Sequence, residues 1–206
     1  MSQNIGSFQT LPIVEMFYSI QGEGFHTGKP AYFIRLGGCN VLCGWCDVKE
    51  SWNPDKHPQK TIPEIADEVL LHPAKSVVLT GGEPLMNNLD TLCEHLHGYG
   101  IKLFLETNGT YELSGKWDWV CLSPKPHHPP RDDFYQYADE LKIIIDTPER
   151  IQWAEESKQK VRRDCKLYLQ PEWNSLEKIL PDIINYCKLN PEWNISIQTH
   201  KYLDIP

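Results

Sequence analysis

Short apolar segments, most of them followed directly by glycines or polar residues, constrain the fold of this chain more than any other feature. The apolar segments lie at residues 13–20, 31–36, 76–80, 102–106, 119–122, 140–145, 166–169 and 195–198. Segments with helical spacing or helix-start signals lie at residues 62–70, 89–96, 148–160 and 175–189. This alternation of short strands with helices predicts a parallel sheet covered by helices.

Local signals define some of the element ends. Thr61 and Glu64 form a capping-box pattern with Pro63 in the first turn, which predicts the start of a helix. Pro181 predicts a kink or a restart within the helix over 175–189. Residues 1–12 carry no comparable pattern, and we expect them to form a loose arm.

Polar clusters recur just past the carboxyl ends of the predicted strands. They are residues 38–47, 81–84, 106–108, 123–125 and 170–171. Ligands bind at this edge in barrels and in open α/β sheets. About six such strands are too few for a closed eight-stranded barrel. We therefore predict an α/β fold, namely a partial TIM-like barrel of about six parallel strands with covering helices.

The composition excludes several classes of protein. The 206 residues include 20 Lys and Arg against 28 Asp and Glu, and this acidic balance argues against bulk nucleic-acid binding. No apolar run approaches the roughly 20 residues needed to cross a bilayer. No linker or repeat marks a second domain, so residues 1–206 are expected to form a single domain. Seven cysteines without a secretory signal favour a reducing, cytoplasmic location.

Three of the seven cysteines fall within eight residues, as Cys39, Cys43 and Cys46. Three thiolates at this spacing can hold a four-iron cluster and leave one iron open to a ligand. The alternative is a structural zinc site completed by His26 or His57. The other four cysteines are scattered through predicted helices and strands, where we expect them to be small core residues.

A second motif, Gly81-Gly82-Glu83-Pro84, follows the strand over 76–80. Two glycines at a strand end expose backbone groups to a ligand, and Glu83 could accept a hydrogen bond or shape the turn. Taken alone, the motif is an ordinary turn.

The two motifs together resemble the radical S-adenosylmethionine (SAM) superfamily. That resemblance implies a partial barrel in which three cysteines hold a [4Fe-4S] cluster and the open iron binds SAM. Electron transfer then cleaves SAM to methionine and a 5′-deoxyadenosyl radical. The Gly-Gly-Glu segment contacts the SAM amino group in this superfamily.

Almost the whole chain is similar to the 7-carboxy-7-deazaguanine synthase family. The similar segments are 19–24, 33–36, 38–40, 45–47, 80–84, 106–109, 123–125, 170–171 and 198–203. This resemblance implies conversion of 6-carboxy-5,6,7,8-tetrahydropterin to 7-carboxy-7-deazaguanine and ammonia, on the route to queuosine and related deazapurines. It also implies Mg2+, a homodimer, and an electron donor such as flavodoxin or ferredoxin.

The resemblance, together with the chemistry of the side chains, predicts which residues bind SAM and which bind the substrate. The SAM-binding positions are Trp45, Cys46, Asp47, Gly82, Glu83, Ser123, Pro124, Lys125, Gln170, Pro171, Glu172 and Trp173. The substrate-binding positions are Ile20, Gln21, Gly22, Glu23, Arg35, Thr80, His200 and Pro206. Arg35 offers a bidentate fork for the pterin carboxylate, and Glu23 an acceptor for a pterin amine. The radical comes from SAM, so no side chain need act as a strong acid or base in the first step.

Four of these residues have simpler alternatives. Arg35 could pair with a surface carboxylate, Lys125 could be a solvated loop residue, His200 could serve as a structural hydrogen-bond partner, and Trp45 could only shield the cluster. Position 48 departs from the family pattern, which has a Thr or Ser hydroxyl there as the Mg2+ ligand. Val48 has no side-chain oxygen, so the alternatives are Asp47, water, substrate oxygens or a weakened metal requirement.

Two other functions fit part of the pattern. A glycyl-radical activating enzyme shares both motifs but acts on a protein, and it would not need Gln21, Glu23 and Arg35 ahead of the cysteines. A non-enzymatic iron–sulfur or zinc module would bind no SAM. Since Gln21, Glu23 and Arg35 are present, the pterin reaction is favoured.

Overall fold

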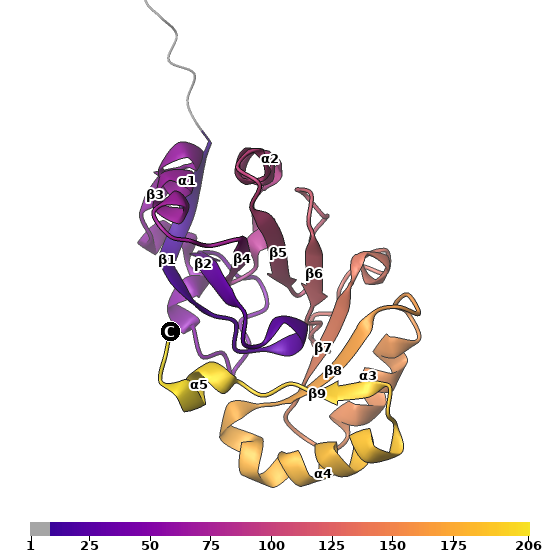
Figure 1. Ribbon diagram of the computed structural model, residues 1–206. Helices are drawn as coiled ribbons and strands as arrows, with labels where there is room; N and C mark the ends of the chain where they lie inside the picture. Colours follow the sequence, from indigo (N-terminus) through magenta and orange to yellow (C-terminus); the bar gives the residue numbers. More distant parts are fainter. Residues whose placement is uncertain (1–8) are drawn as a thin grey trace, which may run out of the picture.

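The computed structural model describes residues 9–206, which form a curved sheet with helices on its outer side (Figure 1). The strands are β1 Thr10–Ile20, β2 Pro30–Leu36, β3 Gln59–Thr61, β4 Ser76–Gly81, β5 Lys102–Thr107, β6 Trp119–Leu122, β7 Glu140–Ile145, β8 Lys166–Pro171 and β9 Trp193–Ile195. The α-helices are α1 Ile62–Leu70, α2 Asp90–Gly98, α3 Arg150–Lys158, α4 Leu176–Leu189 and α5 Thr199–Leu203. The 3-10 turns are η1 Gly24–His26, η2 Lys49–Trp52, η3 Pro54–Lys56, η4 Pro84–Met86, η5 Phe134–Tyr137 and η6 Trp173–Ser175.

The strand order within residues 9–206 is β3-β1-β2-β4-β5-β6-β7-β8-β9. Successive pairs from β2 to β9 are parallel, whereas β1 is antiparallel to both β2 and β3. The predicted partial barrel is confirmed, with one more parallel strand than expected in this part of the chain. The strand at the amino end runs antiparallel because a short connection to β2 leaves no room for a crossover helix.

Three boundaries differ from the prediction. The last strand ends at Ile195, earlier than predicted, and the chain then turns into α5, which was not predicted. β3 was also missed, because neither it nor α5 is long enough to show a period. Thr10–Pro12 was expected in the loose arm but pairs with β3, since Leu11 is buried. The rest of that arm, residues 1–8, lies outside the described residues.

The helix signals are largely confirmed. Thr61 caps α1 by accepting from the backbone N–H of Glu64, while the Glu64 carboxylate accepts from the N–H of Thr61. By contrast, α4 runs through Pro181 without a restart. Ile179 and Ile183, two residues before and after this proline, are both buried and hold the helix on the sheet.

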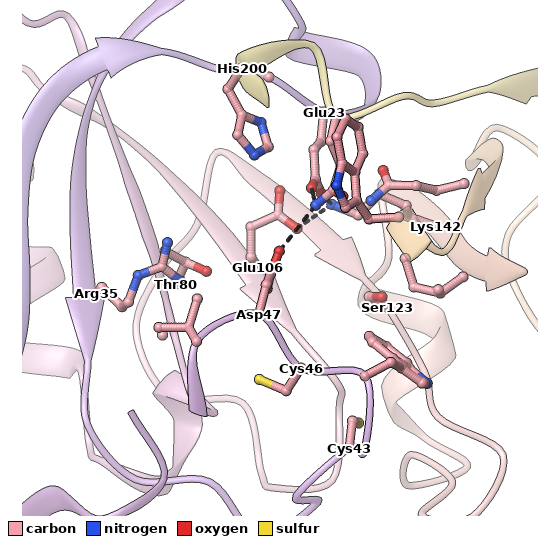
Figure 2. A pocket seen from close by; sticks show the side chains of 18 of the residues that line it. Glu23, Arg35, Cys43, Cys46, Asp47, Thr80, Glu106, Ser123, Lys142 and His200 are labelled. Carbon is pink, nitrogen blue, oxygen red and sulfur yellow. Dashed lines mark hydrogen bonds and ion pairs between the residues drawn. The ribbon is translucent and has the colours of Figure 1, made fainter. Parts of the chain in front are cut away.

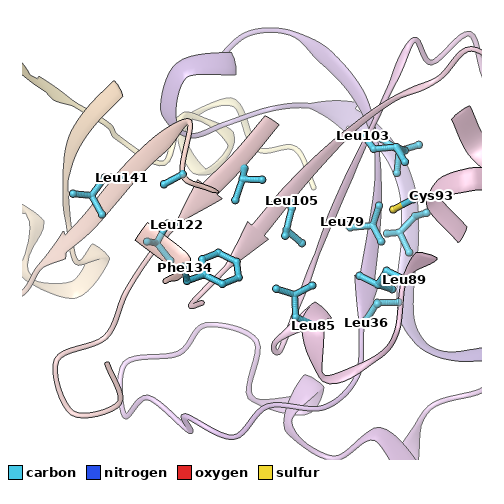
Figure 3. Close-up of a cluster of buried hydrophobic side chains, with 14 of the residues drawn as sticks. Leu36, Leu79, Leu85, Leu89, Cys93, Leu103, Leu105, Leu122, Phe134 and Leu141 are labelled. Carbon is cyan, nitrogen blue, oxygen red and sulfur yellow. The ribbon is translucent and has the colours of Figure 1, made fainter. Parts of the chain in front are cut away.

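The strands present different side chains on their two faces. On the inner face, Arg35, Thr80, Glu106 and Lys142 line a cavity (Figure 2). The outer face is apolar and packs against the helices, with a core that includes Leu36, Leu79, Leu85, Leu89, Cys93, Leu103, Leu105, Leu122, Phe134 and Leu141 (Figure 3). Because alternate residues of a strand point to opposite faces, one set of strands supplies both the core and the cavity wall.

The cysteines outside the motif behave as predicted for core residues. Cys93, Cys121 and Cys165 are buried, and Cys187 packs against the core. Within the described part of the chain, every helix is too short or too polar to span a bilayer.

Candidate active site

A cavity of about 420 Å³ lies inside the curved sheet, at the carboxyl edge of the parallel strands. Its walls come from the cysteine loop, from the ends of β2, β4, β5, β7 and β8, and from the C-terminal segment. The structure gathers nearly all of the predicted site residues here. They are Ile20, Gln21, Gly22, Glu23, Arg35, Cys39, Cys43, Trp45, Cys46, Asp47, Val48, Thr80, Gly82, Ser123, Lys125, Gln170, Pro171, Glu172, Trp173, His200 and Pro206.

Two predicted SAM contacts do not line this cavity. Glu83 is fully buried beneath the Gly-Gly turn, where it accepts from the Thr107 hydroxyl at 2.6 Å and the Asn108 N–H at 2.7 Å. Burial raises the pKa of Glu83, although these donors favour its ionised form. Its side chain therefore ties β4 to β5 and shapes the turn. Pro124 borders a neighbouring recess of about 20 Å³ instead.

The Gly-Gly turn is locked onto the start of the cysteine loop. The N–H of Glu83 donates to the Gly38 carbonyl at 2.7 Å, and the N–H of Gly82 donates to the Leu36 carbonyl at 3.0 Å. A Cβ atom on Gly82 would overlap the Gly38 carbonyl, so only glycine allows this approach. The two sequence motifs are thus one structural unit at the carboxyl ends of β2 and β4.

The donor set of the cysteine loop fits an iron–sulfur cluster better than a single metal ion. All three thiols line the cavity, yet within residues 9–206 no three His, Cys, Asp or Glu side chains are grouped to hold one ion. His26 stacks on Phe104 with ring centroids 4.4 Å apart, and His57 contacts the Glu50 carbonyl at 2.8 Å. Neither histidine completes the alternative zinc site. His127 lies nearer, with Nε2 3.9 Å from Cys43 Sγ, but no group of three potential ligand side chains is gathered around one point in residues 9–206. Three neighbouring thiols match a four-iron cluster with one open iron.

Lys125 and Trp45 lie together beside this loop. The Lys125 ammonium donates to the Ser123 carbonyl at 2.5 Å and the Ser123 hydroxyl at 2.8 Å, and lies 5.6 Å from the centroid of the Trp45 ring. Burial lowers the pKa of Lys125, and burial raises that of the Cys43 thiol while the Lys125 charge opposes this rise. Lys125 is therefore a fixed charge near the thiols rather than a solvated loop residue.

Glu23 lies on another wall, next to Glu106 and Lys142. The sequence predicted no role for these two charged residues. The Lys142 ammonium lies 2.6 Å from Glu23 Oε2 and 2.9 Å from Glu106 Oε2 (Figure 2). Burial would raise the pKa of Glu23, but the Lys142 charge and hydrogen bonds from Lys142 and Gln198 outweigh it and hold the pKa at about 2. The available signal was a lysine between apolar residues in the strand of residues 140–145, because a buried charge needs a partner.

Arg35 lies on β2 directly opposite Thr80 of β4, and both line the cavity. Its Nε donates to Glu15 Oε1 at 2.6 Å. Arg35 therefore does pair with a carboxylate, as the simpler alternative predicted. The guanidinium side chain is only 19% exposed. Arg35 therefore serves both as an ion-pair partner and as a cation in the cavity wall.

The C-terminal segment closes the cavity. In Figure 1 it runs from β9 back to β1, where the Ser19 hydroxyl donates to the Pro206 carbonyl at 3.0 Å. The N–H of Thr199 donates to the Gly22 carbonyl at 2.9 Å. A Cβ on Gly22 would overlap Nδ1 of His200, so glycine lets His200 approach the cavity. Burial lowers the pKa of His200, which favours the neutral ring.

The predicted Mg2+ position lies at the end of the cysteine loop. Val48 lines the cavity with carbon atoms only. The Asp47 carboxylate accepts from the Lys201 ammonium at 3.1 Å and from the Gln198 amide at 3.4 Å. The Lys201 ammonium also lies 4.6 Å from the centroid of the Trp173 ring. The Asp47 carboxylate, which is the side-chain oxygen donor next to Val48, is thus already paired with Lys201.

Comparison with known proteins agrees with the geometry. A model of the radical SAM superfamily matches residues 33–120. The 7-carboxy-7-deazaguanine synthase of Flavobacterium psychrophilum is 47% identical, covering 96% of this chain and 94% of that protein. The synthase of Synechocystis sp. is 46% identical, covering 94% and 93% of the two chains. The crystal structure of QueE from Escherichia coli superposes with a TM-score of 0.81 at 30% identity, covering 92% of this chain and 94% of that one. This chain therefore belongs to the radical SAM superfamily and, within it, to the 7-carboxy-7-deazaguanine synthase family.

Proposed function

We propose that this protein is a radical SAM enzyme that converts 6-carboxy-5,6,7,8-tetrahydropterin to 7-carboxy-7-deazaguanine and ammonia, a step in queuosine and deazapurine biosynthesis. The observation that carries this proposal is one cavity with three cysteine thiols, the Arg35 guanidinium and the Glu23 carboxylate in its walls. The thiols suit a cluster, the guanidinium suits a carboxylate, and the Glu23 carboxylate suits the N–H donors of a pterin.

Cys39, Cys43 and Cys46 would hold the [4Fe-4S] cluster, with SAM beside it. Held there and reduced, the cluster would supply the electron for the reductive cleavage of SAM, and SAM would supply the radical chemistry at C6 of the pterin. The chain would bind SAM through Trp45, Asp47, Gly82, Ser123, Lys125 and residues 170–173, which line the cavity. Their part is to orient SAM and to exclude water from the radical.

The substrate would bind across β2, β4 and the segment after β1. Arg35 would take the pterin carboxylate, with the Thr80 hydroxyl next to it. Glu23 would accept from a pterin N–H, and the backbone around Gln21 would border the ring edge. His200 and Pro206 would close the cavity over the ring, since the C-terminal segment is bonded to both Ser19 and Gly22.

The Mg2+ implied by the resemblance does not fit the side chains at its expected position. Mg2+ prefers an octahedron of hard oxygen ligands, whereas Val48 offers none and Asp47 is paired with Lys201. We therefore expect a weakened metal requirement. Any bound ion would be held mainly by water and substrate oxygens.

Several further properties are proposed from the resemblance and the composition. They are a cytoplasmic location, a single domain over residues 1–206, a homodimer, and reduction by a flavodoxin or ferredoxin. The composition supports the first of these, since seven cysteines without a secretory signal suit a reducing compartment. Size-exclusion chromatography with light scattering tests the dimer.

The proposed reaction is tested by anaerobic reconstitution with iron and sulfide, followed by incubation with SAM, dithionite and the carboxypterin. We expect 7-carboxy-7-deazaguanine and ammonia in equal amounts. Arg35→Lys should lower kcat/KM for the pterin by about 10- to 100-fold, because a point charge cannot replace a bidentate fork. SAM cleavage without product would instead favour a glycyl-radical activating enzyme. Failure to take up a cluster would favour a non-enzymatic module.

A further inference from the structure

Lys142 is a buried charge in the middle of a strand. Its side chain is 4% exposed, and its neighbours on β7, Leu141 and Ile143, are fully buried in the core. Removing an ammonium from water costs several kcal/mol, so a lysine at this position needs close anionic partners. The carboxylates of Glu23 and Glu106, at 2.6 and 2.9 Å, provide them.

The three charged groups face the cavity rather than the core. Glu23, Glu106 and Lys142 all line it, and the two carboxylate side chains are 19% and 22% exposed (Figure 2). Glu23 Oε1 also accepts from the Gln198 amide at 2.9 Å. A single carboxylate would neutralise the lysine, so the second one leaves this wall with a net negative charge.

A third carboxyl group, Glu140, lies two residues before Lys142 on the same face of β7. Its Oε2 accepts from the N–H of Phe25 and from the Trp119 indole, both at 3.1 Å. Its Oε1 is buried and has no hydrogen-bond partner among residues 9–206. Burial raises the pKa of Glu140 to about 7, while that of Glu23 is held at about 2. Glu140 is therefore partly protonated at neutral pH, whereas Glu23 is ionised beside the cavity.

This charge distribution suits a ligand with N–H donors at one end and a carboxylate at the other. The cation of Arg35 lies on β2, whereas Glu23 and Glu106 flank the lysine of β7. A carboxypterin has ring and amino N–H groups that donate to carboxylates, and one carboxylate that pairs with a guanidinium. Opposite charges on two walls would fix which way the ligand lies.

We propose that Lys142 is a positioning residue, which holds Glu23 and Glu106 as two ionised acceptors for the N–H groups of the pterin. The inference rests on the proposed function and adds a specificity determinant to it. Lys142 itself need not touch the substrate. Without the ammonium, two neighbouring carboxylates would repel one another, and one of them would take up a proton and lose acceptor capacity.

The test is binding of the carboxypterin to reconstituted enzyme with SAM and no reductant, measured by calorimetry. Lys142→Met should raise the pterin dissociation constant by about 10- to 100-fold, the loss of one or two charge-assisted hydrogen bonds. The SAM dissociation constant should change by less than about 3-fold, since no SAM-binding residue is lost. Lys142→Arg keeps the positive charge and should recover most of the affinity. Lys166→Met, at an exposed strand start, is the matched control and should bind as wild type.

The pH dependence gives an independent measure. With a pKa of about 2, Glu23 contributes no acidic limb above pH 5 to the wild-type binding profile. Glu140 lies near Lys142 and His200 lies near Glu23, and both are present in the variant as well, so the measure is the difference between the two profiles. In Lys142→Met the two carboxylates share a proton, so pterin affinity should fall with decreasing pH between about 7 and 5. A purely structural lysine would leave this profile unchanged.

Three results would overturn the proposal. One is a pterin dissociation constant in Lys142→Met within about 3-fold of wild type. Another is an equal loss of SAM and pterin affinity, which marks general disruption. If Lys142→Met does not fold, unchanged pterin affinity in Glu106→Gln overturns it as well, because that variant removes one of the two proposed anionic acceptors. Binding needs no turnover, so the absence of product from the wild-type enzyme refutes only the proposed reaction.

Discussion

The two faces of β5 show how one strand serves two purposes. Leu103 and Leu105 point outward and are fully buried in the core beneath the helices. Between and after them, Phe104 and Glu106 point inward, where Phe104 stacks on His26 and Glu106 pairs with Lys142. The outer positions need apolar volume, whereas the inner positions need particular functional groups.

β7 repeats the contrast with charges. Leu141 and Ile143 join the outer core, while Glu140 and Lys142 face the other way. An ionised pair inside a sheet contributes little net stability, because desolvation offsets the attraction. We infer that inner-face charges are kept for ligand binding. Substitutions on the two faces should therefore have separable effects, on stability for the outer face and on binding or chemistry for the inner face.

The largest effect is expected at the cysteines that we propose as ligands of the cluster. Cys46→Ala should lower turnover by at least about 1000-fold, equivalent to about 4 kcal/mol, because the cluster loses one of three ligands. Far-UV circular dichroism should remain that of wild type. Iron and sulfide analysis after reconstitution checks the cause. Cys93→Ala, on the outer side, should retain full iron content, and equal iron loss in both variants would refute this division.

On the outer face, Leu105→Ala should reduce the free energy of unfolding by about 2–5 kcal/mol, through lost burial and a residual cavity. The KM values for SAM and pterin should stay within about 2-fold of wild type at a temperature where the variant is folded. Chemical denaturation and steady-state kinetics measure the two quantities. A large rise in either KM with unchanged stability would contradict the division between the faces.

Glu140→Gln sharpens the comparison at an inner position that has no direct access to the cavity. The pKa of Glu140 is raised to about 7, so the contribution of Glu140 to stability is fully present below pH 4.5 and is lost as pH rises through 7. Glutamine mimics the protonated acid and should be more stable than wild type by about 1–3 kcal/mol at pH 8, with no difference at pH 4.5. Thermal unfolding between these pH values provides the measurement. A constant difference at every pH would count against this titration.

The smallest effect is expected at the end of the cysteine loop. Val48→Thr restores the hydroxyl of the family pattern and should increase the stimulation of turnover by Mg2+ by a few-fold, without changing stability. Turnover is titrated with Mg2+ after treatment with a chelator. Superimposable titrations of the variant and wild type would show that position 48 does not matter for the metal.

Local sequence signals predicted much of this molecule. The cysteine spacing, the Gly-Gly turn and the Thr61–Glu64 capping box lie within a few residues each, and the structure places them as expected. Short elements such as α5 escaped prediction because five residues carry no usable period. The prediction of a loose arm was wrong at Thr10–Pro12. This segment pairs with β3, which lies some 50 residues away in the sequence.

The partners of Lys142 in the charged inner wall could not be predicted from the sequence. Glu23 and Lys142 are 119 residues apart, and only the closing of the sheet brings them within hydrogen-bond distance. At Glu83 the sequence motif was recognised, but the predicted SAM contact of its side chain was not found. The buried carboxylate instead links β4 to β5 through hydrogen bonds from Thr107 and Asn108. The roles of these residues depend on the strand face that each side chain occupies. Tertiary packing determines that face, and local sequence does not show it.

The central claim is that the inner face brings SAM and the pterin close enough for direct hydrogen transfer. The most direct test uses carboxypterin deuterated at C6, with SAM re-isolated after turnover and examined by mass spectrometry. We predict that the rearranged pterin radical takes a hydrogen atom back from 5′-deoxyadenosine, so that SAM is regenerated rather than consumed and carries deuterium at the carbon that becomes the radical. Unlabelled SAM alongside labelled solvent, or one SAM lost per product, would contradict this account.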